Sequence, residues 1–559
     1  MLKYRPDIDG LRALAIIPVV WFHSDLPGLP GGFTGVDTFF VISGFLISAI
    51  IHREVQAGTF TFGSFYERRM RRIGPALIFT VSVTLAVGSV MLLPHELEAL
   101  AKSAIAALLM VPNIHFWSEA GYFRLGDSIT PLLHTWSLGV EEQFYLLFPI
   151  ALILAQRLRG RSGFDTHRWL VTGIALASLA LCLYATSRWP SASFYLLPTR
   201  AWELMAGALI AVGVIRLPQS LGTPASLLGL ALLGAAAALI NERDLFPGYL
   251  AIVPVAGAAL IIAAGEGAAG NRVLAARPLV WLGKRSYSLY LWHWPVFVFL
   301  RDWSGELSPM MAAAGMTLSI GLTAISYRFV EQPFRRKLNF RAVAGATGAG
   351  AASIAAVAAI MLIGNGLPQR IPPNAITAIA VKDDLPPFAH ACVNVPVERA
   401  WADCRVGTGT PSVAVWGDSH AAATGAAIAE GLDQAAVILS ANTCAPTERW
   451  VSSGRKGAEA DRCRSRNKAI ADALIADASI RTVVLSSYWA SYDAETGGSF
   501  WQSVQPQIDA LRASGKAVYI LAGIPSAGVN VPRAAAIAIM RNEKPPSLNC
   551  PPPPLRRFL

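Results

Sequence analysis

Arg12 and His23 are ionisable residues at the two ends of an otherwise apolar run near the N-terminus. Their separation of eleven residues, at about 100° each, turns a helix back to within about 20° of its starting direction, so both side chains share one face, roughly 16 Å apart along the axis. Ionisable groups in a membrane segment are costly and usually line a bundle interior or a water-filled path. Pro18 between them predicts a bend that frees a backbone carbonyl. The alternative is a charged flank and an interfacial histidine on an ordinary first span.

Ser419 stands in a different setting, directly after the short apolar run 412–416 and before an alanine-rich helical pattern. A serine on a strand-to-helix turn lies above a sheet edge, where backbone N–H groups of the helix N-terminus can stabilise an oxyanion. This setting is typical of a serine hydrolase or acyltransferase, while a helix N-cap formed by Asp418 or Ser419 is the simpler alternative. A nucleophilic serine also needs a base. No histidine follows His420 up to Leu559.

Other ionisable residues stand inside or at the ends of apolar runs further along the chain. One such group near the end of a span is more often a snorkelling side chain than a catalytic one. Acids, arginines and histidines on several spans instead favour a shared polar cavity. The residues concerned are Asp37, His134, Glu141, Glu142, Arg200, Glu203 and His293.

A compact basic cluster consists of Arg68, Arg69, Arg71 and Arg72. Such a cluster beside an apolar run ordinarily sets membrane topology and binds anionic lipid headgroups. The sharper hypothesis is capture of the phosphates of a cytosolic donor, because the arginine side chain binds phosphate through two parallel hydrogen bonds.

The composition indicates a membrane protein. Hydrophobic residues make up 53% of the 559 residues and charged residues only 15%, whereas soluble proteins carry about a quarter charged residues. Repeated apolar runs of about 20 residues predict a polytopic helical domain. The net charge of +11 raises nucleic acid as a partner. The basic residues gather at the ends of apolar runs, so we expect the lipid bilayer as the partner and no nucleic acid.

Eleven transmembrane helices are predicted. The apolar segment 97–117 is a possible twelfth, but the cytoplasmic loops collect most Lys and Arg only if this segment does not cross, so we expect it to be interfacial or re-entrant. With a cytoplasmic N-terminus, eleven spans place the C-terminus outside. The predicted spans are 10–25, 35–52, 75–93, 136–156, 169–186, 200–215, 222–240, 248–264, 286–301, 311–330 and 342–364.

The composition changes after the last predicted span. Residues 365–410 are polar and rich in proline, which predicts a linker with little regular structure. From residue 411 the pattern is that of a soluble α/β domain. Four apolar strand-like runs alternate with helical patterns, so we expect three layers, with helices flanking a parallel sheet. The runs are 412–416, 436–440, 482–486 and 517–522.

Five of the six cysteines lie beyond residue 390, which points to an oxidising compartment for the C-terminal part. Cys392 with Cys404, and Cys444 with Cys463, have spacings that would close short disulfide loops, although four cysteines allow three pairings. Cys550 then has no partner, and Cys182 lies inside a span. The tight pairs of thiols with histidines that zinc prefers are absent from the sequence, so we expect no metal site.

Several motifs, taken in order, resemble those of the membrane acyltransferase-3 family. The resemblance covers about residues 1–340, and 341–364 would form an additional transmembrane helix. Residues 413–420 resemble the start of the SGNH-type domain that is fused to one branch of this family, so 411–559 would be a partial domain of this type. The motifs of the membrane part are residues 4–15 with the Arg12-x10-His23 spacing, 35–47, 131–145, 195–203, 286–295 and 331–334.

The resemblance implies transfer of an acyl group, typically acetyl from acetyl-CoA, to a cell-envelope glycan such as lipopolysaccharide O-antigen, peptidoglycan or exopolysaccharide. Arg12 and His23 match the family's essential pair, with His23 as the base or a transient acyl carrier. The cytoplasmic Arg-x-x-Arg pattern, satisfied twice within the basic cluster, would engage the CoA donor. The polar-cavity positions Asp37, His134, Glu142 and Arg200 match recurring motif positions. No permanently bound cofactor is implied, and the expected location is the bacterial inner membrane.

In the SGNH-type part, the resemblance gives Ser419 the nucleophile position. The family's Asp-x-x-His, which supplies the base, has no counterpart before Leu559. Asn442 is a candidate for the oxyanion asparagine only by proximity. We therefore expect either a truncated sequence or an extracytoplasmic site that is inactive or completed differently. Two rival functions stay open, a transporter of acyl groups or glycans without transferase chemistry and an esterase that the spans merely anchor.

Overall fold

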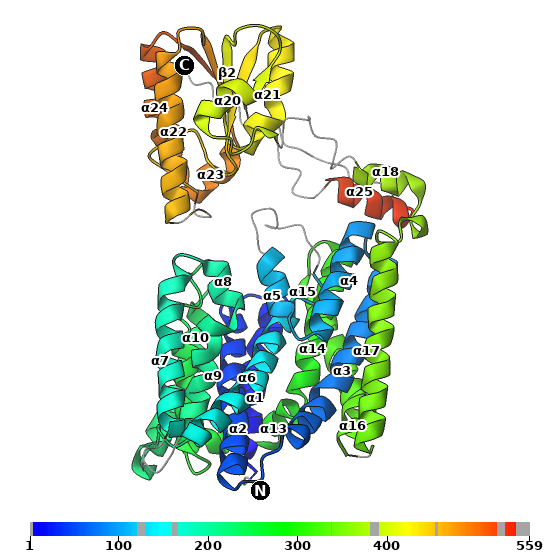
Figure 1. Ribbon diagram of the computed structural model, residues 1–559. Helices are drawn as coiled ribbons and strands as arrows, with labels where there is room; N and C mark the ends of the chain where they lie inside the picture. The colour runs from blue at the N-terminus through cyan, green and yellow to red at the C-terminus, as the bar shows by residue number, and fades with distance from the viewer. Residues whose placement is uncertain are drawn as a thin grey trace. The chain divides into compact units, whose positions relative to one another are not determined.

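The computed structural model describes residues 4–119, 130–158, 166–336, 338–380, 391–452, 455, 457–522 and 531–543. The chain divides into two compact units, Met1–Pro368 and Gln369–Leu559, whose folds are drawn in Figure 1. Each unit has its own apolar core. The chain therefore combines a helical unit with a unit built around a β-sheet.

Every predicted span of the helical unit coincides with a helix. Seven helical stretches of the described residues are long and apolar enough to cross a membrane, whereas α1, α9, α11 and α14 are shorter or less apolar. This is a membrane protein with several apolar helices, and the number of eleven spans stays a prediction. The helices are α1 (Pro6–Phe22), α2 (Gly35–Gln56), α3 (Phe62–Met91), α6 (Trp136–Leu158), α7 (Thr166–Thr186), α9 (Leu197–Ala211), α10 (Gly222–Leu239), α11 (Ile252–Ala264), α14 (Ser286–Ser304), α15 (Pro309–Ile325) and α17 (Phe340–Ile363).

The apolar segment 97–117 belongs to two helices, α4 (Pro94–Leu108) and α5 (Pro112–Glu119), rather than to one. They are separated at Met110, whose φ of 57° is left-handed and cannot continue a helix. Helices of 15 and 8 residues extend about 22 and 12 Å, less than a hydrocarbon core of about 30 Å. The break therefore excludes one long crossing helix here.

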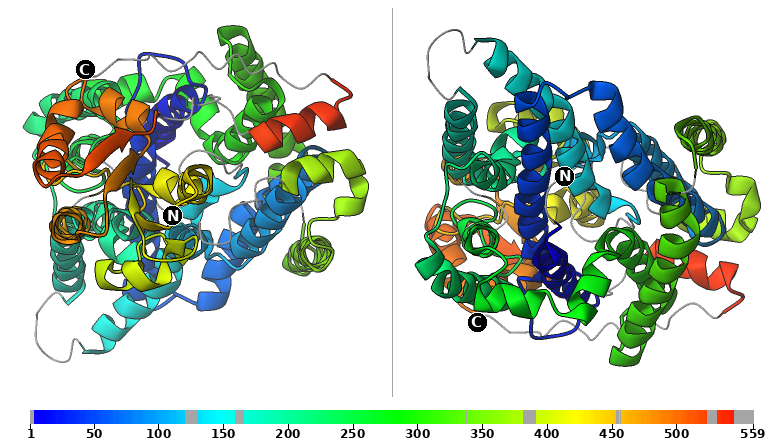
Figure 2. Two further views of the ribbon diagram at one scale, coloured as in Figure 1. Left: turned by 90° about the horizontal axis from the view of Figure 1, so that it is seen from above. Right: turned by 90° about the horizontal axis from the view of Figure 1, so that it is seen from below.

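The N-terminal helices lie among the other helices of their unit. Figure 2 shows α1 and α2 in dark blue, and α1 packs against α2, α14 and the short helix α13 (Arg277–Gly283). The helix α1 continues through Pro18. Two glycines let α2 and α9 touch, because a Cβ at Gly44 or at Gly207 would overlap the backbone of the facing helix. This close approach brings Asp37 of α2 beside Arg200 of α9.

The second unit contains a five-stranded sheet of order β1-β3-β2-β4-β5. Apolar clusters on its two faces show three layers, since one includes residues of α22 (Ala458–Ala476) and α24 (Trp501–Ala513) and the other residues of α21 (Ser419–Leu432). Figure 1 shows these helices on opposite sides of the sheet. The strands are β1 (Arg405–Val406), β2 (Val413–Gly417), β3 (Ala436–Ser440), β4 (Thr482–Ser486) and β5 (Ala517–Ile520).

The prediction of a wholly parallel sheet is wrong at one edge. The strands β2, β3, β4 and β5 are parallel, but β1 pairs antiparallel with β3. The long strands were predictable because each is a continuous apolar run. A pairing of two residues, by contrast, has no periodicity that a sequence can reveal.

The segment 365–410, predicted to be a linker with little regular structure, contains ordered elements. Among them are α18 (Pro373–Ala380), α20 (Val397–Asp403) and β1, while residues 381–390 lie outside the described ones. The misleading signal was proline. Pro373 stands at the start of α18 and Pro396 directly before α20, positions that proline tolerates because no N–H is needed there. The sheet unit therefore begins before residue 411.

Candidate active site

A cavity with a volume of about 830 Å³ lies in the helical unit. It is lined by His23 at the end of α1, Asp37 of α2, His134 and Arg200. Aromatic side chains supply much of the remaining wall, among them Phe22, Phe33, Trp136, Phe194, Tyr195, Phe246, Tyr290 and Trp294. The structure thus brings together four residues that the sequence analysis had placed in or at the ends of four different predicted spans. We call this space the outer cavity.

His23 is the C-cap of α1, and three residues of α14 hold it. Its Nδ1 lies 3.0 Å from Nε2 of His293, and its ring meets the Trp294 ring edge-on at 4.7 Å between centroids. Its carbonyl accepts a hydrogen bond from Arg301, which also forms an ion pair with Asp25 at 2.7 Å. The His23 ring is therefore fixed at the wall of the outer cavity.

His134 also lies near His293, in the helical turn Leu133–Thr135 that leads into α6. The ring centroids of His134 and His293 are 5.9 Å apart, and His134 is only 4% exposed. The Leu291 backbone lies near its ring. Neither ring nitrogen, however, has a partner with hydrogen-bond geometry among the described residues. A buried donor of this kind, beside a cavity, is available to a ligand.

Arg200 is held by carboxylates within the protein. Its guanidinium lies 3.1 Å from Asp37 and 3.0 Å from Glu203, and all three side chains are at most 1% exposed. Four aromatic rings enclose the guanidinium at 5.5 to 5.8 Å from their centroids, those of Phe40, Trp136, Phe194 and Phe246. A buried guanidinium needs such partners, because an unpaired charge would be strongly destabilising. Arg200 and Asp37 therefore form a rigid wall of the outer cavity.

A second cavity, of about 380 Å³, lies at the other end of α1, and we call it the inner cavity. Its lining includes five basic side chains, Arg12, Arg72, Lys284, Arg335 and Arg336, against the two acids Asp9 and Glu331. Arg12 forms an ion pair with Asp9 at 2.8 Å, and Glu331 forms one with Arg335 at the same distance. The excess of positive charge favours an anionic ligand.

The predicted basic cluster does not act as one unit. Arg68 forms an ion pair with Glu54 at 2.9 Å, and Arg71 forms one with Glu67 at 2.8 Å. Arg69 lies over the Phe65 ring, at 5.9 Å from its centroid. Of the four arginines, Arg72 lines the inner cavity. A run of neighbouring arginines on a helix points in several directions, and donor binding by all four stays a prediction.

Glu142 also differs from its expected place. It is absent from the lining of the outer cavity, and its electrostatic neighbours are Arg69 and Arg72. The adjacent Glu141 accepts a hydrogen bond from Ser43 at 2.8 Å. One step along a helix turns a side chain by about 100°, so Ser43 bonds to Glu141 while Arg69 lies near Glu142, although both acids lie near Arg72.

A small cavity of about 70 Å³ lies between the other two, and we call it the connecting cavity. It shares Arg12, Arg72, Ser286 and Tyr287 with the inner cavity, and it shares Val36 and Tyr290 with the outer cavity. Its polar lining includes Ser43, Ser137 and Glu141. The three cavities therefore follow one another between Arg12 and His23.

Ser419 of the sheet unit is the exposed first residue of α21. Asp418 before it caps this helix and is itself saturated, since it accepts hydrogen bonds from the His420 amide, the Tyr488 amide and the Tyr492 hydroxyl at 2.6 to 2.9 Å. The alternative of an N-cap is thus correct for Asp418. Ser419 as a nucleophile stays a prediction.

The segments that follow β2, β3 and β4 meet at one edge of the sheet, because these strands are parallel neighbours. Ser440 donates a hydrogen bond to the Asp418 carbonyl at 2.7 Å, and Ser487 accepts one from the Asp418 amide at 3.1 Å. Asn442, the candidate for the oxyanion asparagine, follows β3 at this edge. Its backbone N–H donates to Oδ1 of Asn394 at 3.2 Å, and its backbone carbonyl accepts from Arg455 at 2.6 Å.

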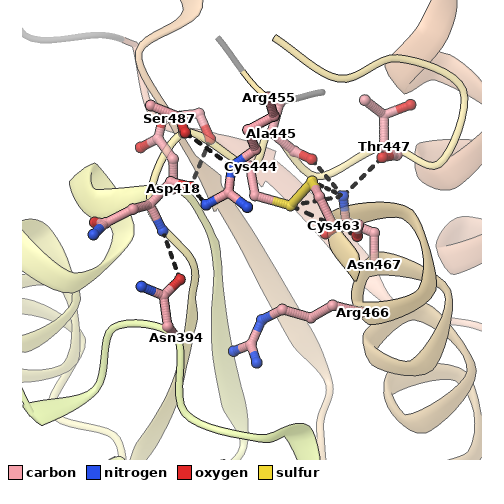
Figure 3. The surroundings of a disulfide bond; sticks show 12 residues. Asn394, Asp418, Cys444, Ala445, Thr447, Arg455, Cys463, Arg466, Asn467 and Ser487 are labelled. Carbon is pink, nitrogen blue, oxygen red and sulfur yellow. Dashed lines mark hydrogen bonds between the residues drawn. A yellow bond between two sulfur atoms is a disulfide. The ribbon is translucent and has the colours of Figure 1, made fainter. Parts of the chain in front are cut away.

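Both cysteine pairs expected from their spacing are joined. Cys392 is bonded to Cys404, and Cys444 is bonded to Cys463 of α22, with Cα atoms 5.4 and 5.8 Å apart. Figure 3 shows the second disulfide beside Asn467, whose amide donates to the carbonyls of Ala445 and Thr447. This bond attaches the loop that carries Asn442 to α22. Cys182 is buried in α7, and Cys550 lies outside the described residues.

Besides Arg455, the basic groups His420 and Arg466 lie at this sheet edge. The His420 Nδ1 lies 3.1 Å from Asp418, and its ring stacks on Tyr488 at 5.2 Å. Arg466 donates to the Ser440 carbonyl at 3.0 Å, and burial lowers the pKa of its guanidinium. Both side chains thus contact residues that follow or end the strands β2, β3 and β4.

Comparison with known proteins agrees with this geometry. The family model of the acyltransferase domain matches residues 5–328. This chain belongs to that family. The model of the SGNH domain fused to AT3 domains matches residues 391–557, which agrees with a sheet unit that begins before residue 411.

Two curated proteins similar to this chain come from Staphylococcus aureus. The O-acetyltransferase OatA of strain NCTC 8325 is 33% identical over 360 residues, which cover 61% of this chain and 59% of OatA. A putative O-acetyltransferase of strain MSSA476 is 31% identical over 371 residues, with the same two coverages. The chain thus spans about three fifths of the length of the curated relatives it matches. No solved structure matches the chain significantly.

Some candidate site residues of this protein were not found from the sequence. Lys284, Arg335 and Arg336 of the inner cavity stand at the ends of apolar runs, where they resemble ordinary topology-setting residues. His293 was noted inside a span, but no partner could be named for it. Its position between two tryptophans in an apolar run was the available signal.

Proposed function

We propose that this protein is an integral membrane O-acyltransferase that moves an acyl group, most simply acetyl, from cytoplasmic acetyl-CoA to a hydroxyl of a cell-envelope polysaccharide. Lipopolysaccharide O-antigen, peptidoglycan and exopolysaccharide are the acceptor classes considered. The observation that carries the proposal is the series of cavities from a basic inner end to His23. Family membership and the similarity to O-acetyltransferases support it.

The inner cavity is the proposed donor site. Acetyl-CoA carries several phosphate charges, and Arg72, Lys284, Arg335 and Arg336 supply matching positive charge. At about 70 Å³ the connecting cavity is too small for a nucleotide but suits a narrow chain. The pantetheine arm would therefore extend past Arg12 while the nucleotide stays at the inner end. Ser43, Ser137 and Glu141 could bind its amides there.

The outer cavity is the proposed reaction site. The acceptor hydroxyl gives its proton to His23 as a C–O bond forms at the thioester carbonyl, and the C–S bond then breaks. The thiolate of coenzyme A takes the proton from His23, so the products are the acetyl ester and free coenzyme A. An N–H of His134 would donate a hydrogen bond to the carbonyl oxygen as it gains negative charge.

The two disulfides support an extracytoplasmic location for the sheet unit, since disulfides persist in oxidising compartments. We therefore propose the bacterial inner membrane, with a cytoplasmic N-terminus and the SGNH-type unit outside. Ser419 would then receive the acyl group for handover, or the acceptor would be acylated directly in the outer cavity.

The test uses the purified full-length protein in detergent with acetyl-CoA and extracted envelope glycans. Coenzyme A release is followed with a thiol reagent, and glycan O-acetyl is measured by mass spectrometry. The wild type is expected to release coenzyme A in proportion to the ester formed, and His23→Ala should lose both signals by at least about 1,000-fold. Wild-type ester levels with His23→Ala would refute the assignment.

A transporter is the second candidate, because a series of cavities between two ends also suits a carrier. Detergent solution removes the two compartments that transport requires. A protein that only carries acyl groups or glycans would release no coenzyme A in that assay. Coenzyme A release that depends on the acceptor therefore separates the enzyme from the carrier.

A further inference from the structure

Both ring nitrogens of His293 have hydrogen-bonding partners, and the two sets of partners differ in kind. Its Nδ1 lies 2.8 Å from the Tyr290 carbonyl and 3.2 Å from the Leu289 carbonyl, both one turn earlier in α14. A carbonyl oxygen can only accept a hydrogen bond. The Nδ1 of His293 must therefore carry the hydrogen. The other nitrogen, Nε2, faces Nδ1 of His23 at 3.0 Å.

The hydrogen on Nδ1 decides the direction of the contact between the two histidines. His293 has no exposed surface, and no carboxylate is among its hydrogen-bond partners in the described part of the chain. Burial without such a partner favours the neutral ring, in which Nε2 has a lone pair and no hydrogen. The hydrogen between the rings therefore belongs to Nδ1 of His23, which leaves the lone pair of His23 on Nε2.

We propose that His293 is a positioning residue that fixes His23 in the Nδ1–H tautomer and so makes Nε2 of His23 the base. This rests on the proposed function. The acceptor proton moves to Nε2 while the C–O bond forms. His23 is then an imidazolium whose Nδ1–H still donates to the lone pair of His293. When Nε2 gives the proton to the departing thiolate, both rings return to their first state.

The arrangement corresponds to the orienting carboxylate of a Ser-His-Asp triad, with a neutral imidazole in the place of the carboxylate. Two further contacts hold His23 in place, one to its ring and one to its backbone carbonyl. Trp294, which meets its edge, donates its own N–H to the Thr130 carbonyl at 2.8 Å, and Arg301 binds the His23 carbonyl. A fixed ring loses little further entropy when the reaction begins.

The tautomer can be tested in the wild-type protein. Full-length protein with ¹⁵N-labelled histidine is reconstituted in liposomes, and the His23 signals are identified by their loss in His23→Gln. We expect a protonated Nδ1 and an unprotonated Nε2 on His23, with the hydrogen bond from Nδ1 to His293. A protonated Nε2 on His23 would overturn the proposal, whatever the activity.

Kinetics separate positioning from packing. His293→Leu keeps bulk but has no acceptor, so kcat should fall at least about 100-fold while KM for acetyl-CoA stays unchanged. His293→Gln restores an acceptor oxygen near the lost Nε2. Its kcat should therefore be at least tenfold higher than that of His293→Leu. Equal losses in both variants would indicate packing alone and contradict the proposal.

His52→Gln is the matched control. His52 also contacts a histidine, His167, at 3.1 Å, but neither residue lines the three cavities. We expect kcat within about threefold of the wild type. The outcomes are distinguishable from failure of the proposed function, because full activity in His23→Gln would refute the use of His23 as a base. The NMR result would still decide the tautomer in that case.

Discussion

The outer cavity and the Ser419 turn are two candidate reaction sites of opposite character. Around the outer cavity, His23 is held at a wall, and neither ring nitrogen of His134 meets a described residue in good hydrogen-bond geometry. At the Ser419 turn, Asp418 is saturated by backbone and side-chain donors, and His420 is engaged with Asp418 and Tyr488. Polar groups left available beside a cavity are aimed at a ligand, whereas saturated ones hold a loop.

The comparison predicts where the largest loss of activity occurs. His23→Ala should lower coenzyme A release by at least about 1,000-fold, because His23 is the proposed base that takes the acceptor proton. Ser419→Ala should leave at least half of the acceptor-dependent release if acylation is direct. Release is measured with the same thiol assay for both variants. Loss of all release in Ser419→Ala, with full release in His23→Ala, would reverse the comparison and favour the anchored esterase.

A second prediction concerns the wall of the outer cavity. Arg200→Met leaves Asp37 and Glu203 buried without their cation, so the free energy of unfolding should fall by about 3–5 kcal/mol. Thermal unfolding in detergent measures this loss. Arg188→Met is the control, because Arg188 lies exposed over the Tyr184 ring and should change stability by less than about 1 kcal/mol. Equal stability of the two variants would show that Arg200 is not structural.

The smallest expected effect is on donor binding, and it sharpens the contrast between the inner cavity and the basic cluster. Arg336→Ala should raise KM for acetyl-CoA about five- to tenfold with kcat unchanged, since one phosphate contact contributes about 1–1.4 kcal/mol. The matched variant is Arg68→Ala, in which the lost partner is Glu54 rather than the cavity. If KM rose more for Arg68→Ala than for Arg336→Ala, the donor would bind at the Arg-x-x-Arg pattern rather than in the inner cavity.

The location of the helices was largely predictable from the sequence. Each predicted span coincides with a helix because long apolar runs must satisfy their backbone hydrogen bonds internally. The four parallel strands were predictable because each is a short apolar run, although β5 is less buried than the other three. The two-residue strand β1 and the helix α20 were missed, because their formation depends on contacts with the sheet rather than on local pattern.

The candidate site was predictable in type but not in detail. Arg12, His23, Asp37, His134 and Arg200 could be named because charged groups in apolar runs stand out. Arg72 could be found as part of the basic cluster, but its separation from Arg68, Arg69 and Arg71 could not. Which way each side chain points depends on helix rotation, and a rotation by one residue changes the neighbours completely.

The sequence by itself determined that this protein has a helical membrane unit followed by an α/β unit, and that Arg12 and His23 share one helix face. Hydrophobicity and period carry that information locally. Only the tertiary structure decided that His293 faces His23, that Arg200 is held between Asp37 and Glu203, and that three cavities follow one another along α1. Those contacts join residues up to 270 positions apart, and the packing of whole helices sets them.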